Sequence, residues 1–304
     1  MKYAIVDLGS NTIRMSIYHV KRDGSIQLLF SQKRMAGLVN YIDHGALNDQ
    51  GITVACQVLQ YFQWLLRQFG MSQMNVFATA SLRNILNTQQ AVDEIFARTG
   101  VAVDVISGEA EAEFGYYGAL LNCDFGTGVM FDIGGGSTEL TTVRDGHILE
   151  AVSYPIGSLN LFNHFVSKLW PNKEELHQLQ DHIFSTLRHA ALPREPVDHV
   201  CGVGGTARAV LKIANTYFDK PEGNRFLTAA ELQEITDVLT ARKHAARKLI
   251  LNSCPDRVHT ILPGTLVMNT IVSTLCRDKL FISKYGVREG YLCQKLLKTV
   301  STGT

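Results

Sequence analysis

Short apolar runs alternate with turn signals at the start of the chain. A short apolar run at 3–7 ends in a carboxylate, apolar and polar residues then alternate over 12–20, and apolar residues resume after a turn at 22–25. A short run, a tight loop, an alternating segment and a second turn are typical of consecutive β-strands. The sequence therefore opens with a predicted strand–loop–strand–turn–strand unit.

Helical spacing dominates the next section. Between Ile52 and Phe69 apolar residues recur every three or four positions, which indicates an amphipathic helix. The following segments alternate between the two classes, with a strand at 75–81, a helix at 88–98, a strand at 101–107 and a helix from residue 108.

The opening unit recurs once, more than 100 residues later. Strand, loop, strand, turn and strand follow one another again over residues 129–153. Aligning Asp7 with Asp132 gives an offset of 132 − 7 = 125, and the same offset pairs Gly9 with Gly134. One recurrence at such a distance indicates two related domains rather than a solenoid of short repeats.

The rest of the second half is richer in helix. We expect a long helical stretch at about 159–190, a strand at 199–203 and mainly helix from there to the end. Thr228 and Glu231 have the spacing of a capping box, which predicts a helix start at this point.

Chain length and the mixture of elements predict the architecture. Two domains are the default for 304 residues, and strands mixed with helices in both halves indicate the α/β class. The predicted domains are residues 1–121 and 122–287, with a C-terminal helix at about 288–304 that packs back on the first domain.

Composition narrows the class of protein. Apolar residues make up 46% and charged residues 19%, which is ordinary for a globular protein with a full core. A formal net charge of +1 argues against a nucleic-acid binder, so an anionic partner must be held by local groups. The six scattered cysteines predict reduced thiols. Without a signal-peptide pattern or an apolar run of membrane-spanning length, we expect a cytoplasmic protein with no membrane partner.

Two glycine-containing loops carry the candidate chemistry. They comprise Asp7, Gly9, Ser10 and Asn11 in the first unit and Asp132, Gly134, Gly135, Gly136 and Ser137 in the second. Small residues let backbone N–H groups close around an oxyanion such as phosphate. Because an aspartate repels phosphate, its useful role is to hold a hard cation such as Mg²⁺. Glu139 could be a further metal ligand or an anchor behind the loop.

A single loop of this kind is more often a structural turn. Two at equivalent places of a duplicated unit instead favour the binding of one anionic ligand from opposite sides. Gly204, Gly205 and Thr206 form a third glycine-rich stretch, where a strand leads into a helix. A helix start suits an anion, but a tight turn also needs small residues, and both interpretations remain open.

The helix from residue 108 carries three glutamates at alternate positions, which cannot share one face. Glu111, Gly115 and Gly118 lie on one side, where two glycines let another backbone come close or leave room for a water. The alternative is that an acid at the helix start is exposed and complements the helix dipole, and this interpretation fits Glu109 better than Glu111. Glu111 is therefore the candidate catalytic carboxylate. Arg83 could hold a phosphate through two hydrogen bonds, or it could be an exposed residue at a helix start.

Several of these stretches together resemble the exopolyphosphatase/guanosine pentaphosphate phosphatase family. The matching segments occur in family order from residue 4 to about residue 292: AIVDLGSNTIRM, FATASLRNILN, VISGEAEAEFGYYGAL, MFDIGGGSTEL, SYPIGSLNL, VCGVGGTARAV, RVHTILPG and KYGVREGYL. The resemblance implies the actin, sugar-kinase and chaperone-ATPase superfold. In that ribonuclease H-like α/β architecture two duplicated domains close on phosphates across a cleft.

The resemblance also implies roles. Glu111 would match the general base that orients water for attack on a terminal phosphoryl group, and Asp132 and Glu139 would match acids associated with Mg²⁺ or Mn²⁺. The implied phosphate-binding residues are Asp7, Gly9, Ser10, Asn11, Arg83 and Gly134 to Ser137. The expected reaction is Mg²⁺-dependent hydrolysis of a terminal phosphoanhydride, which releases orthophosphate from inorganic polyphosphate or, alternatively, from guanosine pentaphosphate.

Two departures from the family pattern bear on the substrate. Many relatives place two acids at the start of the catalytic helix, whereas here Ala110 precedes Glu111. Longer members continue into a helical C-terminal domain, so long-polymer binding is in doubt. A kinase of the same superfold and a non-enzymatic sensor of polyphosphate or alarmones stay as alternatives. A homodimer would be ordinary, but no surface is specified.

Overall fold

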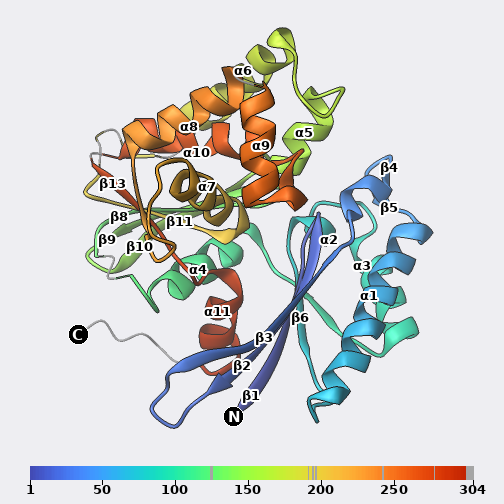
Figure 1. Cartoon of the computed structure of the whole chain (residues 1–304). Coiled ribbons are helices and arrows are strands. Elements are labelled where there is room, and N and C mark those ends of the chain that lie inside the picture. The colour runs from blue at the N-terminus through green and yellow to red at the C-terminus, as the bar shows by residue number, and fades with distance from the viewer. Residues whose placement is uncertain are drawn as a thin grey trace. The chain divides into compact units, whose positions relative to one another are not determined.

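The computed structural model describes residues 1–123, 126–190, 192–193, 195, 197–241, 243–276 and 278–298. Contacts between α-carbons divide the chain into two compact units, Met1–Gly108 and Glu109–Thr304. Each unit contains its own sheet with helices packed on it (Figure 1). The domain boundary expected from the sequence, after residue 121, stays a prediction.

The first unit has a five-stranded sheet in the order β3-β2-β1-β6-β7. Its strands are β1 (Lys2–Leu8), β2 (Thr12–Val20), β3 (Ile26–Met35), β6 (Asn75–Ala78) and β7 (Val103–Val105). The first three are antiparallel neighbours, and β6 and β7 add in parallel beyond β1. The predicted strand–loop–strand–turn–strand opening is confirmed.

The helices of the first unit agree with the spacing at 52–69 and 88–98, but the shortest of them begins at Ala80, inside the segment 75–81 predicted as a strand. They are α1 (Asp49–Gln68), α2 (Ala80–Arg83) and α3 (Thr88–Thr99), with a 3₁₀ turn η1 (Leu38–Tyr41) and a small hairpin of β4 (Ile42–Asp43) and β5 (Ala46–Leu47). Asn48 caps α1 by accepting a hydrogen bond from the Gly51 N–H at 2.9 Å. Gly100 ends α3 in the left-handed conformation, at φ 68°, which glycine adopts without strain.

The second unit has a six-stranded sheet in the order β10-β9-β8-β11-β13-β12. Its strands are β8 (Gly128–Ile133), β9 (Thr138–Arg144), β10 (His147–Tyr154), β11 (His199–Val203), β12 (Phe226–Thr228) and β13 (Lys279–Ile282). Its helices are α4 (Gly108–Ala119), α5 (Ser158–Phe165), α6 (Lys173–Arg188), α7 (Gly204–Tyr217), α8 (Ala229–Ala241), α9 (Lys243–Ser253) and α10 (Ile261–Leu275).

The hairpin repeat predicted from the sequence is present in the backbone. In the first unit the Gly9 N–H donates to the Thr12 carbonyl at 3.2 Å, and in the second the Gly134 N–H donates to the Ser137 carbonyl at 2.9 Å. Both glycines and both acceptors differ by the offset of 125. The strand order is repeated too, because β8 pairs antiparallel with β9 and parallel with β11 as β1 does with β2 and β6.

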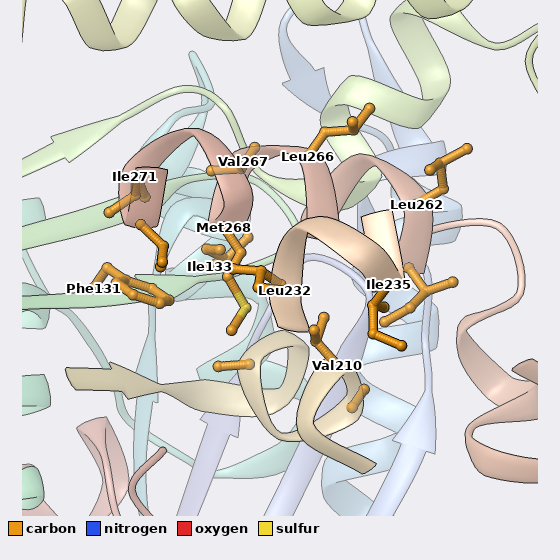
Figure 2. Close-up of a cluster of buried hydrophobic side chains, with 14 of the residues drawn as sticks. Phe131, Ile133, Val210, Leu232, Ile235, Leu262, Leu266, Val267, Met268 and Ile271 are labelled. Carbon is orange, nitrogen blue, oxygen red and sulfur yellow. The ribbon is translucent and has the colours of Figure 1, made fainter. Parts of the chain in front are cut away.

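Alternation along β8 separates the two faces of the second sheet. Phe131 and Ile133 point into a large core closed by α7, α8 and α10 (Figure 2). Helix α10 lies at the centre of this core and packs against α5, α6, α7 and α8. Met130 points the other way and joins a smaller cluster with Val203 and with Tyr116 of α4. Successive strand residues face opposite sides, so α4 covers the face that carries the even-numbered residues of β8.

Two predictions about the second half are wrong in detail. The expected long helix at 159–190 is two helices, α5 and α6, and α6 has its own capping box formed by Asn172 and Glu175. The expectation of mainly helix after residue 203 missed β12 and β13, which add an edge to the sheet. The capping box of Thr228 and Glu231 is confirmed, with reciprocal hydrogen bonds of 3.0 and 3.1 Å.

The end of the described chain is a helical turn, α11 (Val287–Tyr291), followed by a π-helical turn, η3 (Leu292–Leu296). It packs on α4, where Gly290 lies against the backbone of Phe114 and the Phe114 and Tyr291 rings are 5.6 Å apart. Residues 299–304, part of the predicted C-terminal helix, lie outside the described residues. Among the described helices, none combines the length and apolar character that a membrane crossing requires.

Candidate active site

The first candidate loop follows Asp7 at the carboxyl end of β1. Its carbonyl groups are tied to the segment after β3, because Ser10 O accepts from the Val39 N–H at 3.2 Å and Asn11 O accepts from the Gly37 N–H at 2.9 Å. Among the described residues, the backbone N–H groups of Ser10 and Asn11 have no acceptor. The loop thus presents donors rather than acceptors, as an anion site requires.

Arg83 lies at the same edge of the first sheet. It is the last residue of α2, which directly follows β6, and β6 runs parallel to β1. Its Nη1 donates to the carbonyl of Ile106, just beyond β7, at 3.3 Å. Ser81, also on α2, donates its hydroxyl to the Leu8 carbonyl. The first unit therefore brings Asp7, its loop and Arg83 together, and the role of Arg83 in phosphate binding stays a prediction.

The second candidate loop is fixed by the start of α5. The Gly134 carbonyl accepts from the N–H and the hydroxyl of Ser158 at 2.9 and 3.0 Å, and the Gly135 carbonyl accepts from the Leu159 and Asn160 N–H groups at 3.0 and 2.9 Å. Within the described chain the N–H groups of Gly135 and Gly136 have no acceptor. With its carbonyls held from behind, the loop keeps these amides pointing away from α5 as a preformed cradle.

Asp132 and Glu139 are direct partners in the β8–β9 ladder. Residues directly opposite each other share one face of a sheet, with Cβ atoms about 4.5–5.5 Å apart, and like charges there repel. Glu139 is buried, and its Oε1 accepts from the Ser137 hydroxyl at 2.6 Å and the Ser153 hydroxyl at 2.7 Å. Asp132 is only partly buried. Glu139 therefore holds the serine of the loop in place, and Asp132 is the more accessible of the two acids.

The third glycine-rich stretch begins α7. Gly204 has φ +80°, and a Cβ there would overlap the carboxylate of Asp132, while a Cβ on Gly205 would overlap the guanidinium of Arg257. The two glycines therefore let one acid and one base approach the first turn of the helix. Thr206 is buried, and its hydroxyl oxygen accepts from Arg257 Nη1 at 3.5 Å.

Arg257 is a site residue that the sequence reasoning missed. Burial lowers the pKa of its guanidinium, and the negative charges of Asp256 and Asp132 oppose that shift. An arginine stays protonated in proteins, so the group remains a cation in a partly buried position. The stretch RVHTILPG was among the family-like segments, but a lone arginine in a turn has no spacing that would indicate a role.

His259 follows on the same segment. Burial lowers the pKa of its imidazole, and the neighbouring Arg257 lowers it further. Its ring meets that of Phe162, on α5, edge to face at 5.3 Å between centroids. The imidazole is therefore biased towards its neutral form beside a fixed cation.

Glu111 is the buried one of the three glutamates at the start of α4, with 8% of its surface exposed, whereas Glu109 and Glu113 are exposed. The Ala112 carbonyl accepts from the Thr141 hydroxyl of β9 at 3.1 Å. Further along the helix, Gly115 lies against Met130 and Val203. These contacts seat α4 on the sheet face that carries Asp132 and Glu139.

The close approach predicted for the glycines of α4 is present. A Cβ on Gly118 would overlap the backbone of Gly286, so this position requires glycine. Within the described residues, no group of three or more His, Cys, Asp or Glu side chains is arranged to hold a metal ion. A cation at this site would have Asp132, supported by Glu139, as its protein carboxylate, and would complete its coordination with water and phosphate oxygens.

A duplicated hairpin, with an acid and a glycine loop at the carboxyl edge of each sheet, defines an α/β protein of the actin-like superfold. The model of the Ppx/GppA phosphatase family matches residues 16–299, and the chain belongs to this family. A Haemophilus influenzae relative named as an exopolyphosphatase is 27% identical over 293 residues, covering 95% of this chain and 90% of the relative. Exopolyphosphatase 1 of Mycobacterium bovis is 23% identical over 304 residues, covering 97% and 88%.

Solved structures agree with this assignment. The crystal structure of the Aquifex aeolicus member of the Ppx/GppA family has a TM-score of 0.80 at 25% identity and covers 100% of this chain and 99% of that one. The predicted fold class is confirmed, and the protein is an enzyme of the phosphatase class.

Proposed function

We propose that this phosphatase hydrolyses the terminal phosphoanhydride bond of inorganic polyphosphate and releases orthophosphate. The observation that carries the proposal is the position of Glu111, buried on the helix that covers the face of Asp132 and Glu139. A buried carboxylate on the face of the sheet that carries these acids suits the activation of water for attack on a phosphoryl group. The names of the relatives supply the substrate class.

Glu111 is proposed to position the attacking water and accept its proton. Phosphoryl transfer needs little covalent chemistry from the protein, so catalysis is positioning plus electrostatic stabilisation of the phosphoryl oxygens. The N–H groups of Gly135 and Gly136 supply fixed dipoles, and the partly buried Arg257 supplies a cation near Asp132. The amides of Ser10 and Asn11 and the guanidinium of Arg83, all in the first unit, are proposed to bind phosphate oxygens.

A divalent cation fits this site. Asp132 and Glu139 stand directly opposite each other, a repulsive pair that a positive charge would relieve. Mg²⁺ or Mn²⁺ would be held by Asp132 and would supply charge neutralisation for the phosphoryl oxygens. Glu139, through its hydrogen bond with Ser137, would hold the loop in position beside that ion.

Guanosine pentaphosphate is the alternative substrate within the same chemistry, since it also ends in a phosphoanhydride and the matched family carries both activities in its name. A phosphate-release assay on polyphosphate, guanosine pentaphosphate and ATP, with and without Mg²⁺, separates the candidates. Release from polyphosphate that depends on Mg²⁺ supports the proposal. Release from guanosine pentaphosphate alone moves the assignment to the nucleotide, and tight polyphosphate binding without release indicates a sensor.

A further inference from the structure

A cavity of about 400 Å³ lies at the other edge of the sheet of the second unit. Its lining includes Lys220, Phe226, Thr228, Glu231 and Lys279. It is formed where β12 ends, β13 begins and α8 starts. The volume lies within the range of about 300–1,000 Å³ that is usual for small-molecule sites.

The direction of the strands separates this cavity from the candidate active site. Strand β13 runs parallel to β11, and Leu280 pairs with Val200, so Lys279 lies level with the first residue of β11. Asp132 pairs with Val203, the last residue of β11, so the catalytic loops lie at the carboxyl edge. The cavity therefore lies at the amino edge, about the length of one strand away, and takes no part in the proposed hydrolysis.

One wall of the cavity is aromatic. Phe226 is 48% exposed although it is directly paired with Phe281, whose ring centroid is 5.2 Å away. Strand β12 is the last in the sheet, so no further strand covers Phe226 from the outside. An exposed ring held beside a second, tilted ring offers an apolar face that could receive another ring.

The acid in the cavity is already used by the protein. Glu231 Oε1 pairs with Lys220 Nζ at 2.5 Å, and Oε2 accepts from the Thr228 N–H at 3.0 Å. Burial acts to raise the pKa of Glu231, but its bonds with Lys220 and Thr228 outweigh burial and hold the pKa below its usual value. Glu231 is thus an ionised carboxylate whose two oxygens are both engaged.

The charge that remains is positive. Lys279 is exposed and has no ion pair or hydrogen bond of its side chain with any described residue. It pairs with Thr228 across the ladder, so both side chains stand on the face that Phe226 and Phe281 share. Two lysines and one glutamate leave a net charge of +1 in the lining.

We propose that this cavity is a second ligand site, which binds a small aromatic anion with its ring against Phe226 and its carboxylate or phosphate on Lys279. The Phe226 ring offers a stacking surface for the aromatic part of the ligand. Lys279 offers a charge-assisted hydrogen bond to the anionic group of the ligand. The start of α8, a helix of 13 residues, adds positive potential on the same side. A cation of the same size would meet Lys279 without a free carboxylate to oppose it.

The test uses the full chain and three probes: benzoate, phenyl phosphate and benzylamine. Backbone amide resonances of residues 226–231 are followed by NMR during titration of each probe, with the amides of residues 134–137 as a reading of the active site. We expect saturable shifts at 226–231 with benzoate or phenyl phosphate and none with benzylamine. The stronger of the two anions identifies carboxylate or phosphate as the preferred group.

Variants assign the binding to the named side chains. Lys279→Gln should weaken binding of the anion about tenfold or more, as expected for the loss of a hydrogen bond to a charged group. Phe226→Ala should weaken this binding severalfold. Lys248→Gln removes a lysine from the exposed face of α9 and should leave binding unchanged. Absence of saturable shifts with either anion, equal shifts with benzylamine, or unchanged affinity in Lys279→Gln with native melting behaviour would each overturn the proposal.

Discussion

Asp132 and Glu139 face each other across the β8–β9 ladder, one partly accessible and the other buried under two serine hydroxyls. The pair concentrates negative charge at the carboxyl edge of the second sheet, next to a loop that offers amide donors and near the partly buried Arg257. This arrangement makes one site attractive both to a cation and to phosphate oxygens.

Glu111→Gln should lower kcat by ~10²–10⁴-fold, the usual contribution of a general base, with KM nearly unchanged. The amide is nearly isosteric but cannot accept the proton of the attacking water. Phosphate release under saturating substrate measures the change, and Glu113→Gln on the exposed side of α4 is the matched control. Near-normal turnover of Glu111→Gln would remove this residue from its proposed role.

Asp132→Asn should raise the Mg²⁺ concentration for half-maximal activity about tenfold or more, because a neutral amide is a poorer ligand for a hard cation. Activity is measured in a Mg²⁺ titration after treatment with a chelator. Asp237→Asn, on the exposed face of α8, changes the same charge elsewhere and should leave the titration unaltered. Full activity of the wild type after metal removal would contradict the proposed cation.

Arg257→Lys should raise KM for polyphosphate about tenfold, whereas the free energy of unfolding should change little. Lysine keeps the charge but loses the planar fork that reaches both the Gly205 backbone and the Thr206 hydroxyl. Arg247→Lys, on the exposed face of α9, is the control. If the two variants had the same KM as the wild type, Arg257 would be a packing residue only.

Gly204→Ala should destabilise the protein by about 1–2 kcal/mol and abolish most activity. The position has φ +80°, which costs an alanine about 1–2 kcal/mol, and the new methyl group would push the Asp132 carboxylate away. Urea unfolding and phosphate release measure the two effects. Gly223→Ala is the control, because a Cβ there meets open space. Native stability and activity in Gly204→Ala would show that the first turn of α7 adapts easily.

His259 should make stability fall as the medium becomes acidic. Burial, and then Arg257, lower its pKa in the folded protein below the ordinary value of 6.5. Between 6.5 and that lower folded pKa the unfolded chain binds more protons, so stability decreases as pH falls through this window and is then constant. His259→Gln should remove this part of the slope in urea unfolding measured from pH 7 downward.

The matched control for this experiment is His177→Gln, which changes an exposed ring on α6. It should keep the slope of the wild type. An unchanged slope in His259→Gln would mean that Arg257 and the surrounding protein do not disfavour the charged imidazole.

Periodicity predicted much of the fold, for a physical reason. The hairpins around Asp7 and Asp132 are made by neighbours in sequence, so alternation and turn residues determine them locally. The same holds for the burial of Glu111, because helical spacing placed it with two glycines on one side. Periodicity could not predict which face of the sheet α4 covers, because the choice of face depends on contacts with Thr141 and Val203, which lie far along the chain.

The missed features share a different cause. Strands β12 and β13 have three and four residues, too few for an alternating pattern to emerge. Arg257 reaches Gly205 and Thr206 from a short turn about fifty positions later, and no spacing rule relates such distant residues. The helix expected at 159–190 is interrupted where Pro171 and the N-cap Asn172 start a new helix.

The copied hairpins differ in one respect that follows from their register. Position 14 stands opposite Asp7 and position 139 opposite Asp132, and these two positions are equivalent, yet one is arginine and the other glutamate. The first half thus places an arginine opposite its acid, whereas in the second half the positive charge near Asp132 comes from Arg257, on a distant turn. A difference of sign at this one position gives the second hairpin a pair of two acids where the first hairpin has an acid and a base.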